Sequence, residues 1–300
     1  MIHHISKVPL DYTHGMTLFV FGDLQYGSDG FNEDAWAQFE QEFKETKNAW
    51  ALGLGDYGDW LRPTMRTRLY QSLAGDDSAR QQLDDMVRKF QEKIFKKMQF
   101  MEGKIIGLHS GHHEHEFASG GNSTQRLASG LRAPYLGWTA STRLCFQKKR
   151  NHDPLRTDHV YSIISTHGSS NSKHTTGVAR AFEMSHVDSW VANHYVMGHA
   201  CKSSSWYPGE RNVVRLSGPA GVDSFPPRCM LVGGFCEGYT DGWSSSYVEK
   251  AGLKPQPISW GVIRFKSVER NLLSNLRGVS TATRVLDVEQ TNRGPKISLI

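Results

Sequence analysis

The sequence predicts an α/β fold built around short buried strands, with a further group of strands toward the C-terminus. Up to about residue 201, short apolar runs alternate with amphipathic helical patterns, which is typical of strand–helix–strand units with parallel strands. Beyond that point, apolar runs lie between glycine- and proline-rich loops, and we expect them to form a second sheet against the first. The 300 residues, 38% of them hydrophobic, suffice for a large core, so we expect one compact domain.

The first expected unit is a strand, a helix and a second, parallel strand. Residues 16–23 form an apolar run with β-branched and aromatic side chains, and the run ends at Asp23. Apolar residues then recur at helical spacing within 32–50, and a second apolar run over 50–56 ends at Asp56. Each strand therefore leaves an aspartate just past its carboxyl end.

Three further strands are expected, and each ends at a histidine: His109, His167 or His199. The expected strands are 103–109, 160–167 and 194–199, and the expected helices are 78–101, 123–131 and 178–191. The long helix 78–101 has one apolar stripe opposite its charges, so it is expected to cover a sheet rather than to carry chemistry.

Acidic and imidazole side chains at the strand ends are expected to meet in one crevice, because ligands of such sheets bind beyond the carboxyl ends of the strands. Taken alone, Asp23 has the pattern of a helix cap or a solvated loop acid, and the histidines at 109, 112, 113 and 115 have that of a polar loop. His167 and His199, however, each adjoin a glycine, which lets backbone and ligand approach closely. Together these residues favour a metal site.

Five short motifs carry a resemblance to a known family. They are Asp23-Leu-Gln25, Gly55-Asp-Tyr-Gly-Asp59, Gly111-His-His-Glu114, His167-Gly168 and Gly198-His-Ala-Cys201. In this order they resemble the calcineurin-like metallophosphoesterases, whose blocks are Asp-x-His, Gly-Asp-x-x-Asp, Gly-Asn-His-Glu, His-Gly and Gly-His-x-His. The later segment 233–263 looks similar to the closing strands of phage and prophage members.

The resemblance implies a four-layer fold in which two mixed β-sheets pack face to face with helices outside. It also implies a single phosphoesterase domain over residues 1–300, with the motif-bearing part at about 16–201 and the closing strands at about 202–300. The implied activity is metal-dependent hydrolysis of phosphate esters, monoester or diester, by a metal-bound hydroxide. One or two divalent ions per chain are expected, with manganese, zinc, iron and nickel as candidates.

The resemblance assigns roles to six residues that match the family blocks. Asp56 would bridge two metal ions, Asp23 would belong to the first metal, and His167 and His199 would belong to the second. His113 would protonate the leaving oxygen or stabilise the transition state, and Asp59 would orient the His113 imidazole.

Three expected ligands depart from the family pattern. Gln25 replaces a histidine, His112 replaces an asparagine, and Cys201 replaces the second histidine of the last block. Gln25 and Cys201 both fall on the first metal, whereas His112 gives the second metal a third imidazole. We therefore expect an asymmetric centre with a tighter second site, and a thiolate at Cys201 would favour zinc over manganese. As an alternative, Cys201 is a small buried apolar residue.

Composition narrows the expected partners and location. The formal net charge is +5 and the sequence pI is about 8.9, which favours an anionic substrate such as a nucleotide or nucleic acid without requiring one. The chain has no apolar run long enough to span a membrane, no secretory pattern at its start and only four scattered cysteines. We therefore expect a cytoplasmic protein with reduced thiols, in the host cytoplasm if the chain is phage-encoded, and no membrane partner.

Two alternative functions stay open from the sequence. A nuclease is favoured if basic and aromatic residues lie beside the metal crevice; the candidates are Lys148, Lys149, Arg150, Trp60, Trp206 and Trp243. A non-catalytic binding or structural protein with a degenerate metal site is favoured by the three departures. The sequence indicates neither the substrate-binding residues nor the oligomeric state.

Overall fold

The structure is a computed structural model of the chain, and it describes residues 1–9, 15–59, 77–150, 153–169, 172, 174–214, 222–239, 257–273 and 280–295. Several positions singled out above lie outside this part of the chain: Trp60, Trp243 and residues 240–256, as well as the side chains of Lys148, Lys149 and Arg150. Among the described residues, no helix is both long enough and apolar enough to cross a membrane.

The first sheet has six strands in the order β14-β13-β2-β3-β4-β5. Their bounds are β2 (Met16–Phe21), β3 (Ala49–Gly53), β4 (Ile105–His109), β5 (Tyr135–Gly137), β13 (Trp260–Leu273) and β14 (Ser280–Arg293). β2, β3, β4 and β5 are parallel, as the sequence predicts for the first two, and β13 joins β2 in antiparallel register.

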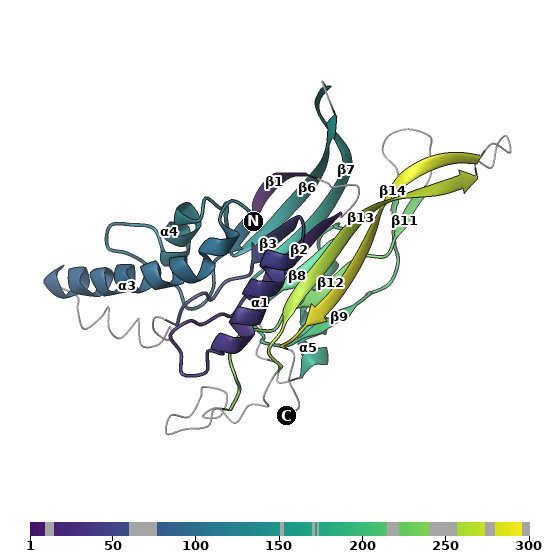
Figure 1. Cartoon of the computed structure of the whole chain (residues 1–300). Coiled ribbons are helices and arrows are strands. Elements are labelled where there is room, and N and C mark those ends of the chain that lie inside the picture. Colours follow the sequence, from purple (N-terminus) through teal and green to yellow (C-terminus); the bar gives the residue numbers. More distant parts are fainter. Residues whose placement is uncertain are drawn as a thin grey trace, which may run out of the picture.

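The second sheet also has six strands, in the order β1-β6-β7-β8-β12-β9. Their bounds are β1 (Ile2–Pro9), β6 (Thr139–Arg150), β7 (Asp153–Thr166), β8 (His194–Met197), β9 (Ser204–Trp206) and β12 (Arg228–Leu231). β10 (Arg211–Val214) and β11 (Val222–Phe225) form a separate antiparallel pair. In Figure 1, the β6–β7 and β13–β14 hairpins extend beyond the helices.

The expectation that the C-terminal strands form a second sheet of their own is wrong. β12 and β9 do join β8 in the second sheet, but β13 pairs with β2 and thereby extends the first sheet, with β14 at its edge. The reason lies in burial: β13 supplies Val262 to the helix-covered face of the first sheet and Ile263 to the face between the sheets, so it needs cover on both sides.

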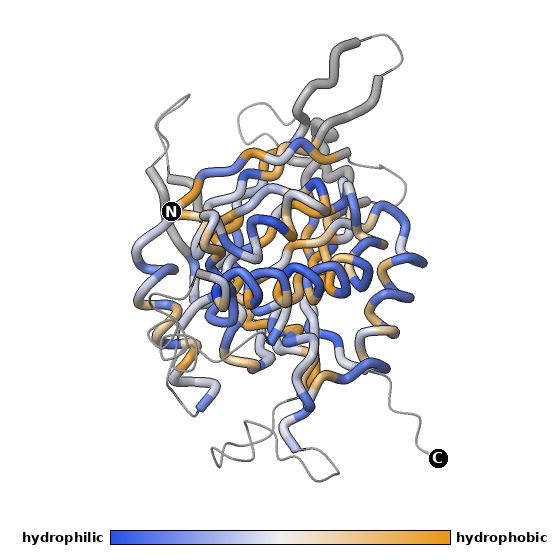
Figure 2. Tube along the Cα trace, turned by 90° about the vertical axis from the view of Figure 1, so that its left-hand side faces the viewer, coloured by the Kyte–Doolittle hydropathy of each residue, from blue (hydrophilic) through white to orange (hydrophobic). Residues whose placement is uncertain are grey.

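The predicted four-layer arrangement is confirmed, because three apolar clusters separate a helix layer, two mixed sheets and a second helix layer. The helical segments are α1 (Glu33–Glu45), α3 (Asp77–Met98), its continuation η1 (Gln99–Met101), α4 (Ser123–Gly130), α5 (Thr175–Phe182) and the π-helical turn η2 (Glu183–Val187). Cluster residues place α1, α3 and α4 on the first sheet, and α5 and η2 on the second. Figure 2 shows the helices with hydrophilic residues along their outer turns.

Strand periodicity explains how one short strand serves two layers. In β2, Phe19 and Phe21 point to the helices, whereas Leu18 and Val20 point to the second sheet, and all four are fully buried. The helix α1 starts where the Asn32 side chain accepts the Ala35 N–H. These elements therefore fix the strand ends that carry the polar motifs.

Candidate metal centre

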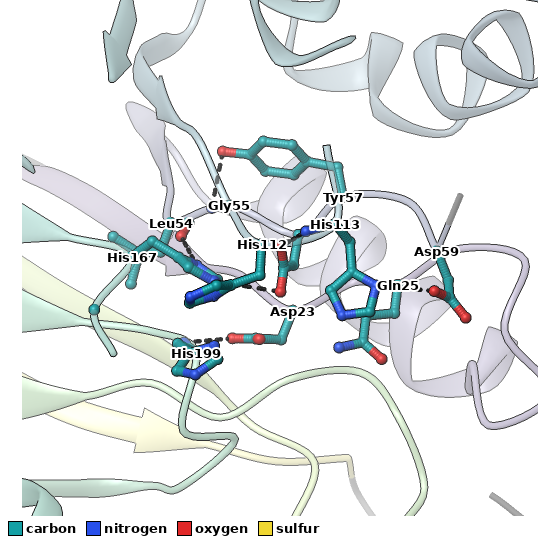
Figure 3. Close-up of polar contacts among 12 residues, drawn as sticks. Asp23, Gln25, Leu54, Gly55, Tyr57, Asp59, His112, His113, His167 and His199 are labelled. Atoms are coloured by element: carbon teal, nitrogen blue, oxygen red, sulfur yellow. Dashed lines mark hydrogen bonds and ion pairs between the residues drawn. The ribbon is translucent and has the colours of Figure 1, made fainter. Parts of the chain in front are cut away.

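The polar motifs meet at one edge of the molecule, where the carboxyl ends of strands from both sheets lie. β2 and β3 lead to Asp23 and Asp56 from the first sheet, and β7 and β8 lead to His167 and His199 from the second. The Asp23 N–H donates to Gly55 O at 3.0 Å, and the Gln25 N–H donates to Asp56 O at 2.9 Å, so the first two loops are bonded side by side. Figure 3 shows the side chains pointing toward one another.

Four of the expected ligands form a compact group that we call the imidazole half: Asp56, His112, His167 and His199. One ligand atom from each lies within 4.8 Å of the others. His167 Nε2 lies 3.0 Å from His112 Nδ1 and 3.3 Å from Asp56 Oδ2, and the His112 and His199 ring centroids are 4.2 Å apart. Two ring nitrogens this close need a shared proton or a shared cation, so the donor set fits a divalent metal ion.

Second contacts hold the imidazole half in position. His167 Nδ1 donates to Leu54 O at 2.7 Å, which directs Nε2 toward Asp56. The His113 N–H donates to Asp56 Oδ1 at 2.8 Å. A Cβ atom at Gly111 would collide with the Asp56 carboxylate, so only glycine fits there.

The remaining expected ligands form what we call the sulfur half: Asp23, Gln25, Cys201 and a further thiol, Cys236. Asp23 Oδ2 accepts the His199 N–H at 2.8 Å, whereas Asp23 Oδ1 is buried and has no hydrogen-bond partner among the described residues. Cys236 Sγ lies 3.7 Å from Gln25 Oε1 and 3.4 Å from Ser28 Oγ. The partnerless carboxylate oxygen beside two thiols also fits a cation.

Burial and neighbouring charges shift the pKa values in both halves. Burial raises the pKa of Asp23 to about 7 despite the nearby His167. Burial alone would lower the pKa of His167, but the Asp56 carboxylate raises it to about 9, and His167 in turn lowers the pKa of Asp56. Burial, reinforced by Asp23, raises the pKa of Cys201. Without a cation, the centre therefore holds protons that a metal ion would displace.

The backbone around the centre is unusual in a way that the sequence does not reveal. Seven non-glycine residues in the described part of the chain have a positive φ, and five of them are expected ligands: Asp23 (46°), Gln25 (43°), Asp56 (54°), His199 (59°) and Cys201 (47°). This left-handed conformation is costly for residues with a Cβ and concentrates at functional sites. The strain coincides with both halves of the candidate centre.

His113 and Asp59 lie together at the mouth of the centre, as the family pattern implies. His113 Nδ1 and Asp59 Oδ1 are 2.9 Å apart, and both side chains are partly exposed. The His113 main-chain N–H donates to Asp56, and the His113 imidazole is not among the four grouped ligand atoms of the imidazole half. This arrangement suits a group that exchanges protons with a substrate.

Two histidines of the polar loop do not reach the centre. His109, at the end of β4, lies between the sheets, where Nε2 is 2.7 Å from Ser165 Oγ and Nδ1 is 3.0 Å from Gly137 O. His115 is buried against Asp84 of α3, with 2.7 Å between Nε2 and Oδ1. Both are structural, so the strand-end argument holds for His167 and His199 but not for His109.

Two residues beside the centre escaped the sequence analysis. Trp138 places its ring edge-on to His112 and His167, with centroids 4.7 and 5.3 Å away. Cys236 reaches Gln25 because Gly234 lets the backbone pass directly over Asp23. The Gly233-Gly234 pair was the available signal for Cys236, whereas Trp138 had none.

No protein-family model matches the chain, and no curated protein matches it. Solved structures do match over most of their length, at low identity. A double mutant of Vps29 from Entamoeba histolytica matches at 10% identity, covering 91% of this chain and 99% of that one, with a TM-score of 0.36. The calcineurin-like phosphoesterase YfkN from Bacillus subtilis matches at 12%, covering 93% and 90%, with a TM-score of 0.42.

A third solved structure is a conserved protein of Streptococcus pneumoniae TIGR4 described as a predicted phosphoesterase. It matches at 12% identity, covers 90% of this chain and 98% of that one, and gives a TM-score of 0.32. The solved structures that this chain resembles thus include calcineurin-like phosphoesterases.

Proposed function

We propose that the protein is a metal-dependent hydrolase of phosphate esters. The single observation that carries this proposal is the group of Asp56, His112, His167 and His199, whose ligand atoms lie within 4.8 Å of one another. Divalent ions bound at such a site offset the charge of a phosphate ester and activate water for attack. The mixed oxygen and nitrogen donors suit manganese, iron, nickel or zinc.

The roles of the individual ligands are part of the proposal. Asp56 faces His167 through Oδ2, is held by the His113 N–H through Oδ1, and lies close enough to Asp23 for their charges to interact. It would be the carboxylate shared by two ions, as the family resemblance implies. His112, His167 and His199 would hold one ion, and Asp23, Gln25 and Cys201 the other. Because amide oxygen is a weak ligand and thiolate a soft one, the two ions would differ in affinity and kind.

His113 is the proposed acid. The Asp59 carboxylate accepts a hydrogen bond from the His113 Nδ1–H, which orients the ring. When the ring carries a second proton on Nε2, it can give that proton to the leaving alkoxide. General acid catalysis of this kind contributes about 10²–10⁴-fold to a rate.

The proposal extends to the substrate class and the cellular location of the protein. A phosphodiester or nucleotide is favoured by the net charge of +5, and the similarity to phage members and the cytoplasmic location stay predictions. A nuclease gains no support from Trp206, whose indole N–H donates to Glu183 and whose ring packs toward Phe182. A non-catalytic metal-binding protein is the alternative that the experiment below separates.

The test compares hydrolysis of p-nitrophenyl phosphate and bis-p-nitrophenyl phosphate with manganese, zinc, nickel and magnesium. We expect metal-dependent turnover that is lost in Asp56→Asn and strongly reduced in His113→Ala. If neither ester, nor nucleotides or DNA, is hydrolysed with any of these metals while the protein still binds metal, the binding role replaces the enzyme role.

A further inference from the structure

A pocket of about 260 Å³ lies beside the imidazole half, between the ends of β7 and β8 and the helical segments α5 and η2. Thr139 and Thr166 form its floor, and their hydroxyl oxygens are 2.9 Å apart. Phe182 and Met197 supply apolar walls. The pocket therefore lies between the second sheet and the helices that cover it, beside the apolar cluster that joins the two.

The pocket adjoins the candidate metal centre through Trp138 and Gly168. Trp138 lines it and is the same residue whose ring meets His112 and His167 edge-on at 4.7 and 5.3 Å. Gly168, which directly follows His167 in the chain, lines it as well. A molecule with one end at the imidazole half would therefore reach the pocket by passing over Trp138, which is 40% exposed.

The residues that line the pocket favour an uncharged ligand. None of the described residues that line the pocket is an aspartate, glutamate, lysine or arginine. His186 of η2 contributes the only titratable side chain among them; its Nδ1 lies 2.7 Å from Ser185 Oγ, and burial lowers its pKa, which favours the neutral ring. The aromatic ring, thioether and hydroxyls suit a flat, uncharged group with a few polar atoms.

Size limits the occupant further. Pockets for drug-sized ligands are about 300–1,000 Å³, so this smaller one suits a single ring system and not a stretch of polymer. The π-helical geometry of η2 is rare and frequently marks functional sites. Here that turn places Ser185 and His186 on the pocket wall.

We propose that this pocket binds the uncharged aromatic part of the substrate, a nucleobase or a phenyl-type ring, while the phosphoryl group lies at the imidazole half. The inference rests on the proposed function and names its substrate class: phosphate esters that carry an aromatic group. The pocket separates such esters from alkyl phosphates, which leave it unfilled.

The test fills the pocket without touching the metal centre. Ala181 lines the pocket from an exposed position of α5, so Ala181→Trp adds a ring there. Met184→Trp is the matched control, because Met184 is 63% exposed nearby and does not line the pocket. Binding is measured by saturation-transfer NMR on metal-free protein with two neutral probes, adenosine and benzyl alcohol, so that no hydrolysis is needed.

We expect at least one probe to bind the wild type and Met184→Trp but not Ala181→Trp, and the probe that binds distinguishes a nucleobase from a simple aryl group. In metal-loaded protein, Ala181→Trp should raise KM for p-nitrophenyl phosphate at least tenfold and leave KM for methyl phosphate unchanged. If neither probe binds the wild type, or both variants behave alike, the pocket is only a packing gap and the proposal is wrong. If no ester is hydrolysed at all, the proposed function fails and the binding result alone decides the pocket.

Discussion

The two halves of the candidate centre are built differently although both lie on strained loops at the same sheet edge. In the imidazole half, four ligand atoms already lie within 4.8 Å of one another. In the sulfur half, the Asp23 Oδ1 atom has no hydrogen-bond partner within the described part of the chain, and the neighbours are a carboxamide and two thiols. The comparison indicates that the ligand atoms of the imidazole half are already in position for an ion. The coordination in the sulfur half, in contrast, depends on which ion binds there.

The largest expected effect comes from the residue that faces both halves. Asp56→Asn removes the only carboxylate of the imidazole half, so we expect loss of both ions and a fall in kcat/KM of at least about 10³-fold. Metal content by mass spectrometry and ester turnover measure this. Asp59→Asn is the control that keeps both ions, and an Asp56→Asn protein with full metal content would break the comparison.

The His113–Asp59 pair should act on the rate alone. His113→Ala is expected to lower kcat by about 10²–10⁴-fold with metal content unchanged, because its ring lies outside both halves. Asp59→Asn should lower kcat by less, since the imidazole itself remains and only the group that orients it changes. Loss of metal from His113→Ala would place this residue among the ligands.

Serine substitutions of the two thiols test the sulfur half. Cys201→Ser should weaken zinc binding there by about 100-fold and Cys236→Ser by about tenfold, because Cys201 interacts directly with Asp23, whereas Cys236 contacts Gln25. Zinc affinity by calorimetry gives both values. Cys145→Ser on β6 is the control for a thiol elsewhere, and equal affinities in all three variants would show that no thiol takes part.

The smallest expected effect appears only in metal-free protein. The pKa of Asp23 is raised to about 7 by burial, so the folded protein binds this proton more tightly than the unfolded chain does. The cost of ionising Asp23 is therefore absent below the ordinary pKa of 3.8, grows as the pH rises from there to about 7, and stays constant above 7. Asp23→Asn should stabilise the metal-free protein by on the order of 2 kcal/mol more at pH 8 than at pH 5, as measured by urea unfolding. Equal stabilisation at both pH values would show that the Asp23 charge is not the cause.

Local sequence patterns predicted several strands of the first sheet. The runs at 16–23, 50–56 and 103–109 became parallel strands because each is apolar on both faces, which only a covered sheet allows. β5 and β9 are three residues each and too short for any periodic signal. The pairing of β13 with β2 was missed because residues so far apart in sequence show no local trace of their contact.

The sequence also predicted that four residues of the candidate site meet at one edge, but it missed two of their neighbours. Short motifs placed Asp23, Asp56, His167 and His199 correctly at one edge, since strand ends of neighbouring strands must meet there. Cys236 and Trp138 come from loops outside those motifs, and only the folded chain brings them to the centre. The single-domain organisation over residues 1–300 stays a prediction.

A zinc titration of metal-free protein tests the asymmetry of the centre most directly. Calorimetry on the wild type, His167→Ala and Cys201→Ser should resolve two unequal binding events in the wild type. The tighter event should disappear in His167→Ala and remain in Cys201→Ser. Two equivalent, tightly held ions per chain, or a tighter event that disappears in Cys201→Ser, would contradict this account.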